Sequence, residues 1–388
     1  MQPPSATSNP PPAIPRVDER ALLAAAGEGD AEIVARSPVA AGLSAGAALE
    51  RLTLRHRVPS GAAWHVSRVV KHLAPSEGWL GAASHDTRIR EAQLHRAGIL
   101  ADLPHGIETA VLALATEGNP AAPTAAALLM RDVRARLPRD PLRTPLGRLP
   151  TLVLAILDRL AEMHARFWCD PRLRDPAPGL VSTADALLLT APERIQARIA
   201  SGDHNPYLPL AAAGWDAFFR LADPADAAAL RAVFRDPAPA VAAIEALPWT
   251  LVHGDVWGPN LGWLPPAHRA SPRSGSRLLL LDWALATAGP CTYDPLWLCG
   301  TWHALDPRRV LAAYRARLER RLHARGIALP PATWRVLAAA GYLRTALTCG
   351  EALGRAAVEA PLGMARWRAE ARVLWWARPD ARSTVASY

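Results

Sequence analysis

The chain has 388 residues, half of them hydrophobic, so it is long enough to bury a large core in one two-lobed unit or in two domains. It contains no uninterrupted apolar run of about 18 residues and no basic-then-apolar leader, which argues against a membrane span or a membrane partner and predicts a cytoplasmic protein. The four cysteines stand far apart without a C-x-x-C pair, which argues against structural zinc and for free thiols.

The net charge of +9 raises nucleic-acid binding as one alternative, because clustered basic side chains neutralise phosphates. The excess is concentrated in residues 308–378, with 14 Arg against 4 Glu, and no recognised nucleic-acid motif accompanies it. A solvated surface in a chain that prefers arginine explains this pattern better, so we expect no nucleic-acid partner.

The preference for arginine singles out one residue. Of the 44 basic side chains only Lys71 is a lysine. Because a lysine offers a compact point charge where an arginine offers a planar fork, the exception indicates a site that tolerates only an ammonium group.

In chain order, residues 1–16 are rich in Pro and Ser and are predicted to be a disordered tail. Residues 18–26 form a short predicted helix with acidic residues near its start. Strands are predicted at residues 32–35, 49–55 and 65–72, and the last of them carries Lys71. Residues 42–46 have two glycines and stand where a phosphate-covering loop would lie, although a plain turn is at least as good an interpretation.

A loop with Pro75 and Gly78 follows, and then Asp86 is the predicted N-cap of a helix over residues 87–97 that carries Glu91. Residues 125–132 read as an apolar strand that turns polar and includes Met130, for which a core position is the default interpretation. The Pro- and Arg-rich residues 134–150 are predicted to be a linker.

Residues 151–168 are the clearest helix in the sequence, because apolar side chains recur there every three or four residues. His164 lies beside that stripe, and a core or capping role is expected for it. Residues 167–248 are predicted to be a helical insertion broken by prolines.

The most informative stretch is residues 249–260, W-T-L-V-H-G-D-V-W-G-P-N. A short apolar run delivers Asp255 into a loop, Asn260 follows it, and a second apolar run ends in Asp282. Phosphoryl transfer needs a carboxylate to accept the acceptor's proton and oxygen ligands for magnesium, and these three side chains are of those types. A turn with a buried His253 and a solvated aspartate is the plainer alternative.

The motif H-G-D-V-W-G-P-N, followed by L-L-L-L-D-W-A-L-A-T-A-G-P, resembles the aminoglycoside phosphotransferase and choline-kinase-like family, whose members are small-molecule kinases. The resemblance implies an α+β fold of the bilobal protein-kinase-like type. A small β-rich N-terminal lobe is expected over residues 17–132 and a larger, mainly helical C-terminal lobe over residues 133–388. The extra length between the two apolar runs is assigned to a hairpin loop at residues 265–277.

The resemblance also implies a role for each matching residue. ATP and Mg²⁺ are the expected cofactors, and Asp255 is the expected catalytic base. The remaining roles are phosphate binding by Lys71, support of Lys71 by Glu91, lining of the adenine pocket by Met130, and magnesium binding by Asn260 and Asp282. Taken alone, Glu91 is an ordinary exposed helix glutamate.

The stretch between Asp282 and Asp294 is too short for the segment that holds a peptide substrate, and Asp282 is not followed by Phe-Gly. Both features favour a small-molecule hydroxyl acceptor such as an aminoglycoside, an amino alcohol or a sugar. Asp294 is expected to brace the catalytic loop, while Trp302, His303 and Asp306 are open to a place on the acceptor rim, in the core or on the surface. A catalytically silent kinase-like scaffold is the alternative function, and the oligomeric state is left open.

Overall fold

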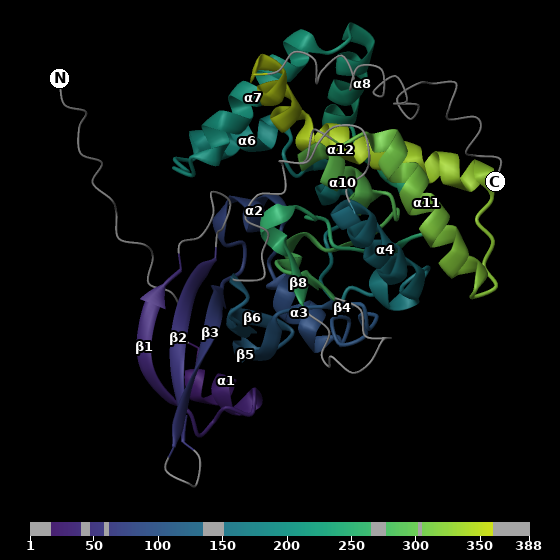
Figure 1. The fold of residues 1–388 in the computed structure, drawn as a ribbon. Helices are drawn as coiled ribbons and strands as arrows, with labels where there is room; N and C mark the ends of the chain where they lie inside the picture. The colour runs from purple at the N-terminus through teal and green to yellow at the C-terminus, as the bar shows by residue number, and fades with distance from the viewer. Residues whose placement is uncertain are drawn as a thin grey trace.

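The computed structural model describes residues 17–39, 47–57, 62–134, 151–264, 277–301 and 305–359 (Figure 1). The predicted tail at residues 1–16 and the two-glycine segment at 42–46 lie outside these ranges, as do residues 135–150 of the predicted linker and residues 265–276 of the predicted hairpin loop. The described residues form a β-sheet region at the N-terminal side and a mainly helical region at the C-terminal side, which confirms the expected fold class.

The small lobe is built on a five-stranded antiparallel sheet with the strand order β1-β2-β3-β6-β5. The three strands predicted before residue 73 are confirmed, each with somewhat longer bounds. The five strands are β1 (Glu32–Pro38), β2 (Ala48–Arg57), β3 (Ala63–Leu73), β5 (Val111–Asn119) and β6 (Ala122–Arg131).

Helices cover both faces of this sheet. Helix α1 (Glu19–Ala25) begins after Asp18, whose side chain accepts hydrogen bonds from the first turn, and its Leu22 and Leu23 pack with Leu54 of β2 and Val70 of β3. On the other face, Ile89 and Ala92 pack with Ala126 of β6. Because side chains alternate along a strand, the two packing sets come from opposite faces of the sheet.

The predicted helix at residues 87–97 begins later than expected. Helix α3 runs over Arg90–Arg96, because Ile89 has a left-handed backbone with φ of 56° and ends the preceding loop there. The carboxylate of Asp86 still accepts a hydrogen bond from the Arg90 amide at 2.8 Å, so it satisfies a first-turn donor from a position further upstream. A short helix, α2 (Gly78–Ala83), occupies part of the stretch predicted to be a loop.

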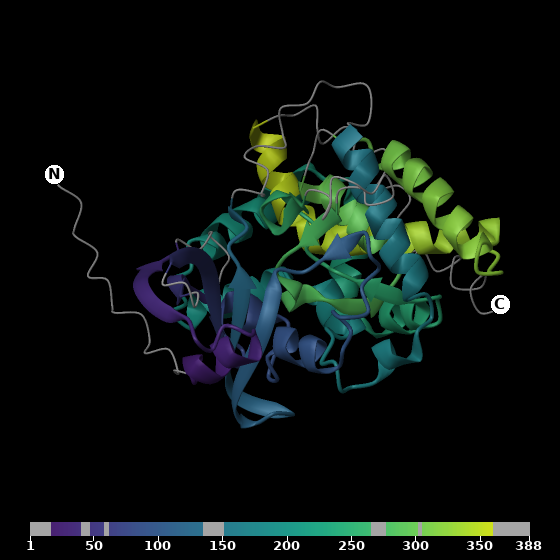
Figure 2. The ribbon, with the colours of Figure 1, turned by 60° about the horizontal axis from the view of Figure 1, so that its bottom comes forward.

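Helix α4 (Thr151–Arg166) is the axis of the large lobe and ends two residues before its predicted end. Ile156, Leu160 and Met163 are buried in the main hydrophobic core, which confirms the predicted stripe. Helix α11 (Pro307–His323) packs along α4 (Figure 2).

The predicted insertion is helical. Pro192 begins one of its helices, while Pro206 and Pro237 cap the starts of two others, as the missing amide of proline permits. Its elements are a 3₁₀ turn at Pro171–Arg174, α5 (Thr183–Leu188), α6 (Pro192–Ala200), α7 (Tyr207–Leu221), α8 (Pro224–Arg235) and α9 (Ala238–Glu245).

Short strands carry the predicted catalytic segments. Strands β8 (Leu261–Leu264) and β9 (Arg277–Leu280) pair antiparallel, as expected for the two arms of a hairpin. Strand β7 (Thr250–Val252) pairs with β10 (Thr287–Gly289), and β4 (Ile107–Glu108) pairs with β9, so the segment after residue 106 joins the same strand that leads to Asp282.

Two further helices complete the described chain. Helix α10 (Tyr293–Thr301) carries Asp294, and α12 (Pro331–Glu359) crosses α7 closely. At that crossing a Cβ on Gly354 would lie 2.0 Å from the carbonyl oxygen of Gly214, so only glycine fits.

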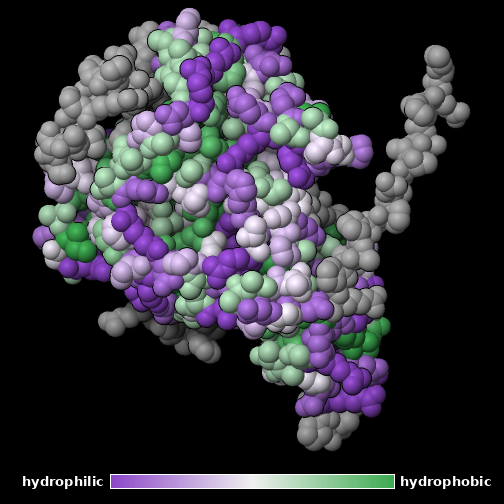
Figure 3. Space-filling model, turned by 180° about the vertical axis from the view of Figure 1, so that it is seen from behind, coloured by the Kyte–Doolittle hydropathy of each residue, from purple (hydrophilic) through white to green (hydrophobic). Residues whose placement is uncertain are grey.

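On the surface, hydrophilic and hydrophobic residues are interspersed over the face shown in Figure 3. Among the described helices, not one combines the length and the apolar character needed to cross a bilayer. The four cysteines are free thiols, and three of them are buried.

Candidate functional site

A cavity of about 670 Å³ lies between the sheet and the large lobe. Its walls come from β2, β3, β6, α3, the loop after β7 and the turn after β9. The six residues singled out from the sequence all line this cavity: Lys71, Glu91, Met130, Asp255, Asn260 and Asp282. Segments up to 211 residues apart therefore meet at one place.

Lys71 is held between two carboxylates. Its ammonium forms an ion pair with Glu91 and lies 3.0 Å from Oδ1 of Asp282. Burial acts to lower the pKa of Lys71, but the charges of Asp282 and Glu91 outweigh it and raise that pKa, so the ammonium stays charged. The lone lysine thus presents a fixed positive charge to the cavity.

Helix α3 also holds the backbone that follows Asp282. The second carboxylate oxygen of Glu91 accepts a hydrogen bond from the Trp283 amide at 3.1 Å. The guanidinium of Arg90 donates to the carbonyl of Ala284 and, at 2.8 Å, to that of Gly179. Asp282 itself has a left-handed backbone with φ of 60°, and α3 holds the two residues that follow it in this turn.

Asp294 braces the loop that carries Asp255, as predicted. Its two oxygens accept hydrogen bonds from the amides of His253 and Gly254, both at 2.9 Å, and from Nε2 of His164 at 3.1 Å. His164 is fully buried and also bonds the hydroxyl of Tyr314, which confirms its core role. These bonds lower the pKa of Asp294 although burial alone would raise it.

His253 supports the loop in the neutral form. Its Nδ1 accepts a hydrogen bond from the Asp255 amide at 3.2 Å, so the proton resides on Nε2, which donates to the Leu281 carbonyl at 2.9 Å. Burial lowers the pKa of this imidazole. His253 therefore joins the loop after β7 to the end of the strand before Asp282.

Asp255 is partly buried and only partly satisfied. Nδ2 of Asn260 donates to its Oδ2 at 2.8 Å and to its carbonyl oxygen at 3.1 Å. Burial and the neighbouring charge of Asp282 raise the pKa of Asp255 to about 7, against the opposite effect of Asn260, Arg344 and Trp297. A carboxyl group with a pKa near neutrality is suited to accepting and returning a proton.

The donor set fits the cofactors that the sequence resemblance implies. The Asn260 amide nitrogen is used by Asp255, which leaves its carbonyl oxygen available, and the side chain of Asp282 is 36% exposed, with only Oδ1 on Lys71. Magnesium prefers such hard oxygen donors and needs few of them from the protein when phosphates supply the rest. Val69 of β3 and Met130 of β6 form an apolar part of the cavity wall.

Two residues of this site were not predicted from the sequence. Arg90 is 2% exposed and Arg344, which donates to the Gly254 carbonyl, is 1% exposed. Arg344 is the only charged residue between Arg335 and Glu351, within an otherwise apolar stretch, and that position was an available signal. Arg90 stands among polar neighbours and gave no comparable signal.

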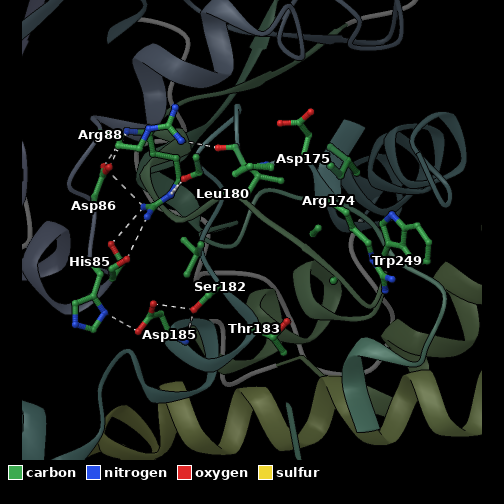
Figure 4. A pocket seen from close by; sticks show the side chains of 18 of the residues that line it. His85, Asp86, Arg88, Arg174, Asp175, Leu180, Ser182, Thr183, Asp185 and Trp249 are labelled. Atoms are coloured by element: carbon green, nitrogen blue, oxygen red, sulfur yellow. Dashed lines mark hydrogen bonds and ion pairs between the residues drawn. The ribbon is translucent and has the colours of Figure 1, made fainter. Parts of the chain in front are cut away.

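A second pocket of about 610 Å³ is lined by residues at the start of α3 and in the loop before it, and by residues of the large lobe (Figure 4). His85 and Ser182 bond the carboxylate of Asp185 on one side of it, and Arg174 stacks on Trp249 on the other, 3.5 Å from the ring centroid. Asp255 does not line this pocket. Its charged groups are used within the protein: His85 pairs with Asp185, while Arg88 and Arg174 donate to backbone carbonyls.

Three residues were left open between the acceptor rim, the core and the surface. Trp302 and His303 lie outside the described residues. Asp306 caps the start of α11, where its side chain accepts from the Arg308 amide at 3.1 Å, so it has a structural role.

Neither a protein-family model nor a curated protein matches the sequence. Among solved structures, choline kinase LicA from Streptococcus pneumoniae is similar at 11% identity and a TM-score of 0.40, over 92% of this chain and 95% of that chain. Ethanolamine kinase from Plasmodium vivax is similar at 12% identity and a TM-score of 0.40, over 91% and 85%. Macrolide 2′-phosphotransferase MphH from Brachybacterium faecium is similar at 17% identity and a TM-score of 0.35, over 88% and 97%. These are small-molecule kinases, the class that the sequence motif resembles, but at such scores the function must rest on the site itself.

Proposed function

We propose that this protein is an ATP-dependent phosphotransferase that transfers the γ-phosphate to a hydroxyl group of a small molecule. The observation that carries the proposal is the convergence of Lys71, Asp255, Asn260 and Asp282 on one cavity between the lobes. A fixed ammonium, a carboxyl group with a pKa near 7 and two oxygen ligands are the parts that phosphoryl transfer uses.

Asp255 acts as the base. Its Oδ2 is held by Asn260, which leaves Oδ1 to accept a hydrogen bond from the acceptor hydroxyl and then its proton. Asp294 and His253 fix the position of this carboxylate through the loop backbone. Positioning of this kind accounts for much of the rate in phosphoryl transfer, where the protein does little covalent chemistry.

Lys71 binds the phosphates of the nucleotide, and Glu91 keeps its ammonium pointed into the cavity. Asn260 and Asp282 would hold magnesium, which supplies charge neutralisation on the phosphates when bound. The charge of Asp282 is at present balanced by Lys71, so nucleotide binding would divide this pair between the metal and the phosphates.

The test is phosphorus NMR of the protein with Mg-ATP and pooled hydroxylated metabolites and antibiotics. We expect a new phosphomonoester signal with the wild type. For Asp255→Ala with a competent acceptor we expect a rate lower by ~10² or more, because a positioned base is lost. A rate within about threefold of the wild type would exclude Asp255 as the base.

A nucleotide-binding scaffold without turnover gives a different outcome in the same experiment. It predicts that Mg-ATP raises the melting temperature through binding to the folded state while no phosphate is transferred to any acceptor in the pool. Lys71→Met should abolish such stabilisation, and exposed Arg335→Met serves as a charge-matched control.

A further inference from the structure

Arg344 lies in the middle of α12, the last described helix, yet it reaches the loop that carries Asp255. Its side chain is buried, with 1% of the residue exposed. The NH2 atom donates to the carbonyl oxygen of Gly254 at 3.1 Å. The residue before Asp255 is therefore held at its carbonyl by α12 and at its amide by Asp294 of α10.

The guanidinium fits between two aromatic rings of α10. Its central carbon lies 4.9 Å from the ring centroid of Tyr293 and 4.8 Å from that of Trp297. Stacking on aromatic faces suits a planar guanidinium and stabilises it by cation–π attraction. Arg344 and Trp297 are both among the groups that act to lower the pKa of Asp255, so the ring that packs on Arg344 lies near the base.

Within the part of the chain that the structure describes, Arg344 forms no ion pair with a carboxylate, and its Nε and NH1 atoms have no hydrogen-bond partner. Burial lowers its pKa, while the charges of Tyr293, Asp294 and Asp255 act in the opposite direction. A buried cation with unused donors is costly for a purely structural position. Its placement beside the catalytic loop gives that cost a functional reason.

The backbone of Gly254 explains why the loop needs the hydrogen bond from Arg344 in addition to the one to Asp294. Its backbone is left-handed with φ of 83°, and a Cβ there would lie 2.2 Å from the carbonyl oxygen of Leu285. Glycine is required at this position, and glycine is the residue with the most backbone freedom. Hydrogen bonds at both its amide and its carbonyl remove that freedom next to Asp255.

We propose that Arg344 is a positioning residue for phosphoryl transfer, which fixes the Gly254 peptide and Trp297 and thereby the orientation of Asp255. This role rests on the proposed function, because it acts through the base. The proposal differs from simple core packing, since it requires a guanidinium and not merely a side chain of similar volume.

Three variants separate these accounts. Arg344→Met keeps most of the volume, Arg344→Lys keeps the charge, and Arg344→Ala leaves a space that free guanidinium ion can enter. We expect kcat to fall by about 10–100-fold in all three, because a small displacement of a catalytic group is enough for such a loss. The KM for ATP should stay within about threefold, since Lys71 and the oxygen ligands are untouched. Arg335→Met, on an exposed position of the same helix, is the matched control and should leave kcat unchanged.

Two readouts distinguish positioning from packing. Millimolar guanidinium chloride should raise the kcat of Arg344→Ala by about threefold or more and leave the kcat of Arg344→Met unchanged. Hydrogen exchange without nucleotide should show faster exchange of the His253 and Gly254 amides in Arg344→Met, with α4 unchanged. If Arg344→Met retains kcat within twofold and these amides stay protected, the proposal is wrong. If Arg344→Met fails to fold, Arg344→Ala and Arg344→Lys decide. If guanidinium ion does not rescue Arg344→Ala and the His253 and Gly254 amides exchange no faster in Arg344→Lys, Arg344 has only a packing role and the proposal is wrong.

The exchange measurement needs no turnover. If the His253 and Gly254 amides exchange faster in Arg344→Met but the wild type transfers no phosphate, the proposed function is wrong. The conclusion that Arg344 fixes the loop would still stand. Unchanged exchange in an active wild type and variant would reject only the role of Arg344.

Discussion

Asp255 lies on the loop after β7 and is partly buried, while Asp294 of α10 is fully buried against that loop, and the two carboxylates have opposite surroundings. Asp294 accepts three hydrogen bonds and has a lowered pKa. Asp255 is held on one oxygen by Asn260, lies near the like charge of Asp282 and has a pKa raised to about 7. The difference shows that a fully hydrogen-bonded carboxylate braces the loop, and it supports the proposal that the partly satisfied carboxylate of Asp255 accepts a proton.

The largest effect expected from this comparison is on catalysis by Asp255→Asn. Phosphate transfer should fall by roughly 10²–10⁴-fold, because the amide cannot take a proton from the acceptor. The free energy of unfolding at neutral pH should not decrease, since a poorly satisfied charge is removed. Steady-state kinetics and urea denaturation of the same preparation measure both. A variant that loses stability in proportion to activity would show that Asp255 is a brace as well.

Asp294→Asn should have the opposite profile. Either orientation of the new amide directs an N–H group at a donor, so about 3 kcal/mol of stability should be lost, on the order of a hundredfold in the folding equilibrium. Urea denaturation followed by far-UV circular dichroism measures the loss. Retention of wild-type stability would mean that the hydrogen bonds to the loop contribute little.

The two aspartates should also differ in the pH dependence of stability. The folded-state pKa of Asp255 is raised from 3.8 to about 7, so its contribution is fully present below pH 3.8 and is lost as the pH rises through about 7. Asp294 has a lowered pKa, so its contribution is present above pH 3.8 and is lost as the pH falls below that value.

The free energy of unfolding of the wild type should therefore be higher at pH 5.5 than at pH 8. Asp255 contributes at most about 1.4 kcal/mol per pH unit to this dependence, and Asp255→Asn should reduce the slope of unfolding free energy against pH. Chemical denaturation at several pH values in a buffer with EDTA measures the slope in the metal-free protein. Equal slopes in the two proteins would argue that solvent relieves the burial of Asp255.

The smallest effect is expected for Tyr314→Phe. This change removes the hydroxyl that bonds Nδ1 of His164, one step behind Asp294, and leaves the ring packed near Trp334. About 1 kcal/mol of stability should be lost, with kcat within about twofold. A fall in kcat of much more than twofold would mean that the Tyr314 hydroxyl contributes to catalysis through His164 and Asp294.

The sequence was sufficient to single out the residues that meet at the cavity, because their pattern is local. His253, Asp255 and Asn260 stand within eight residues, and Asp282 ends an apolar strand, so their types and spacing carry the information. The pairing of Lys71 with Glu91 was predicted from the resemblance, and the ion pair is present in the structure.

What the sequence did not reveal depends on long-range contacts. Arg344 is 90 residues from the carbonyl that it bonds, and Arg90 is 194 residues from that of Ala284. Ile89 delays the start of α3 through a left-handed backbone that tertiary packing imposes on a β-branched residue. Periodicity reports which side of an element is buried, and it does not report which distant backbone group a buried arginine will meet.

The close crossing of α7 and α12 has a consequence for how this protein can change over evolutionary time. Gly354 and Gly214 allow the insertion to touch the helix whose Arg344 holds the loop beside Asp255. A larger residue at either glycine would shift α12 and disturb the loop as well. Substitutions in the insertion are thus mechanically linked to this loop through α7, so we expect sequence variation to arise first in insertion helices that do not touch α12.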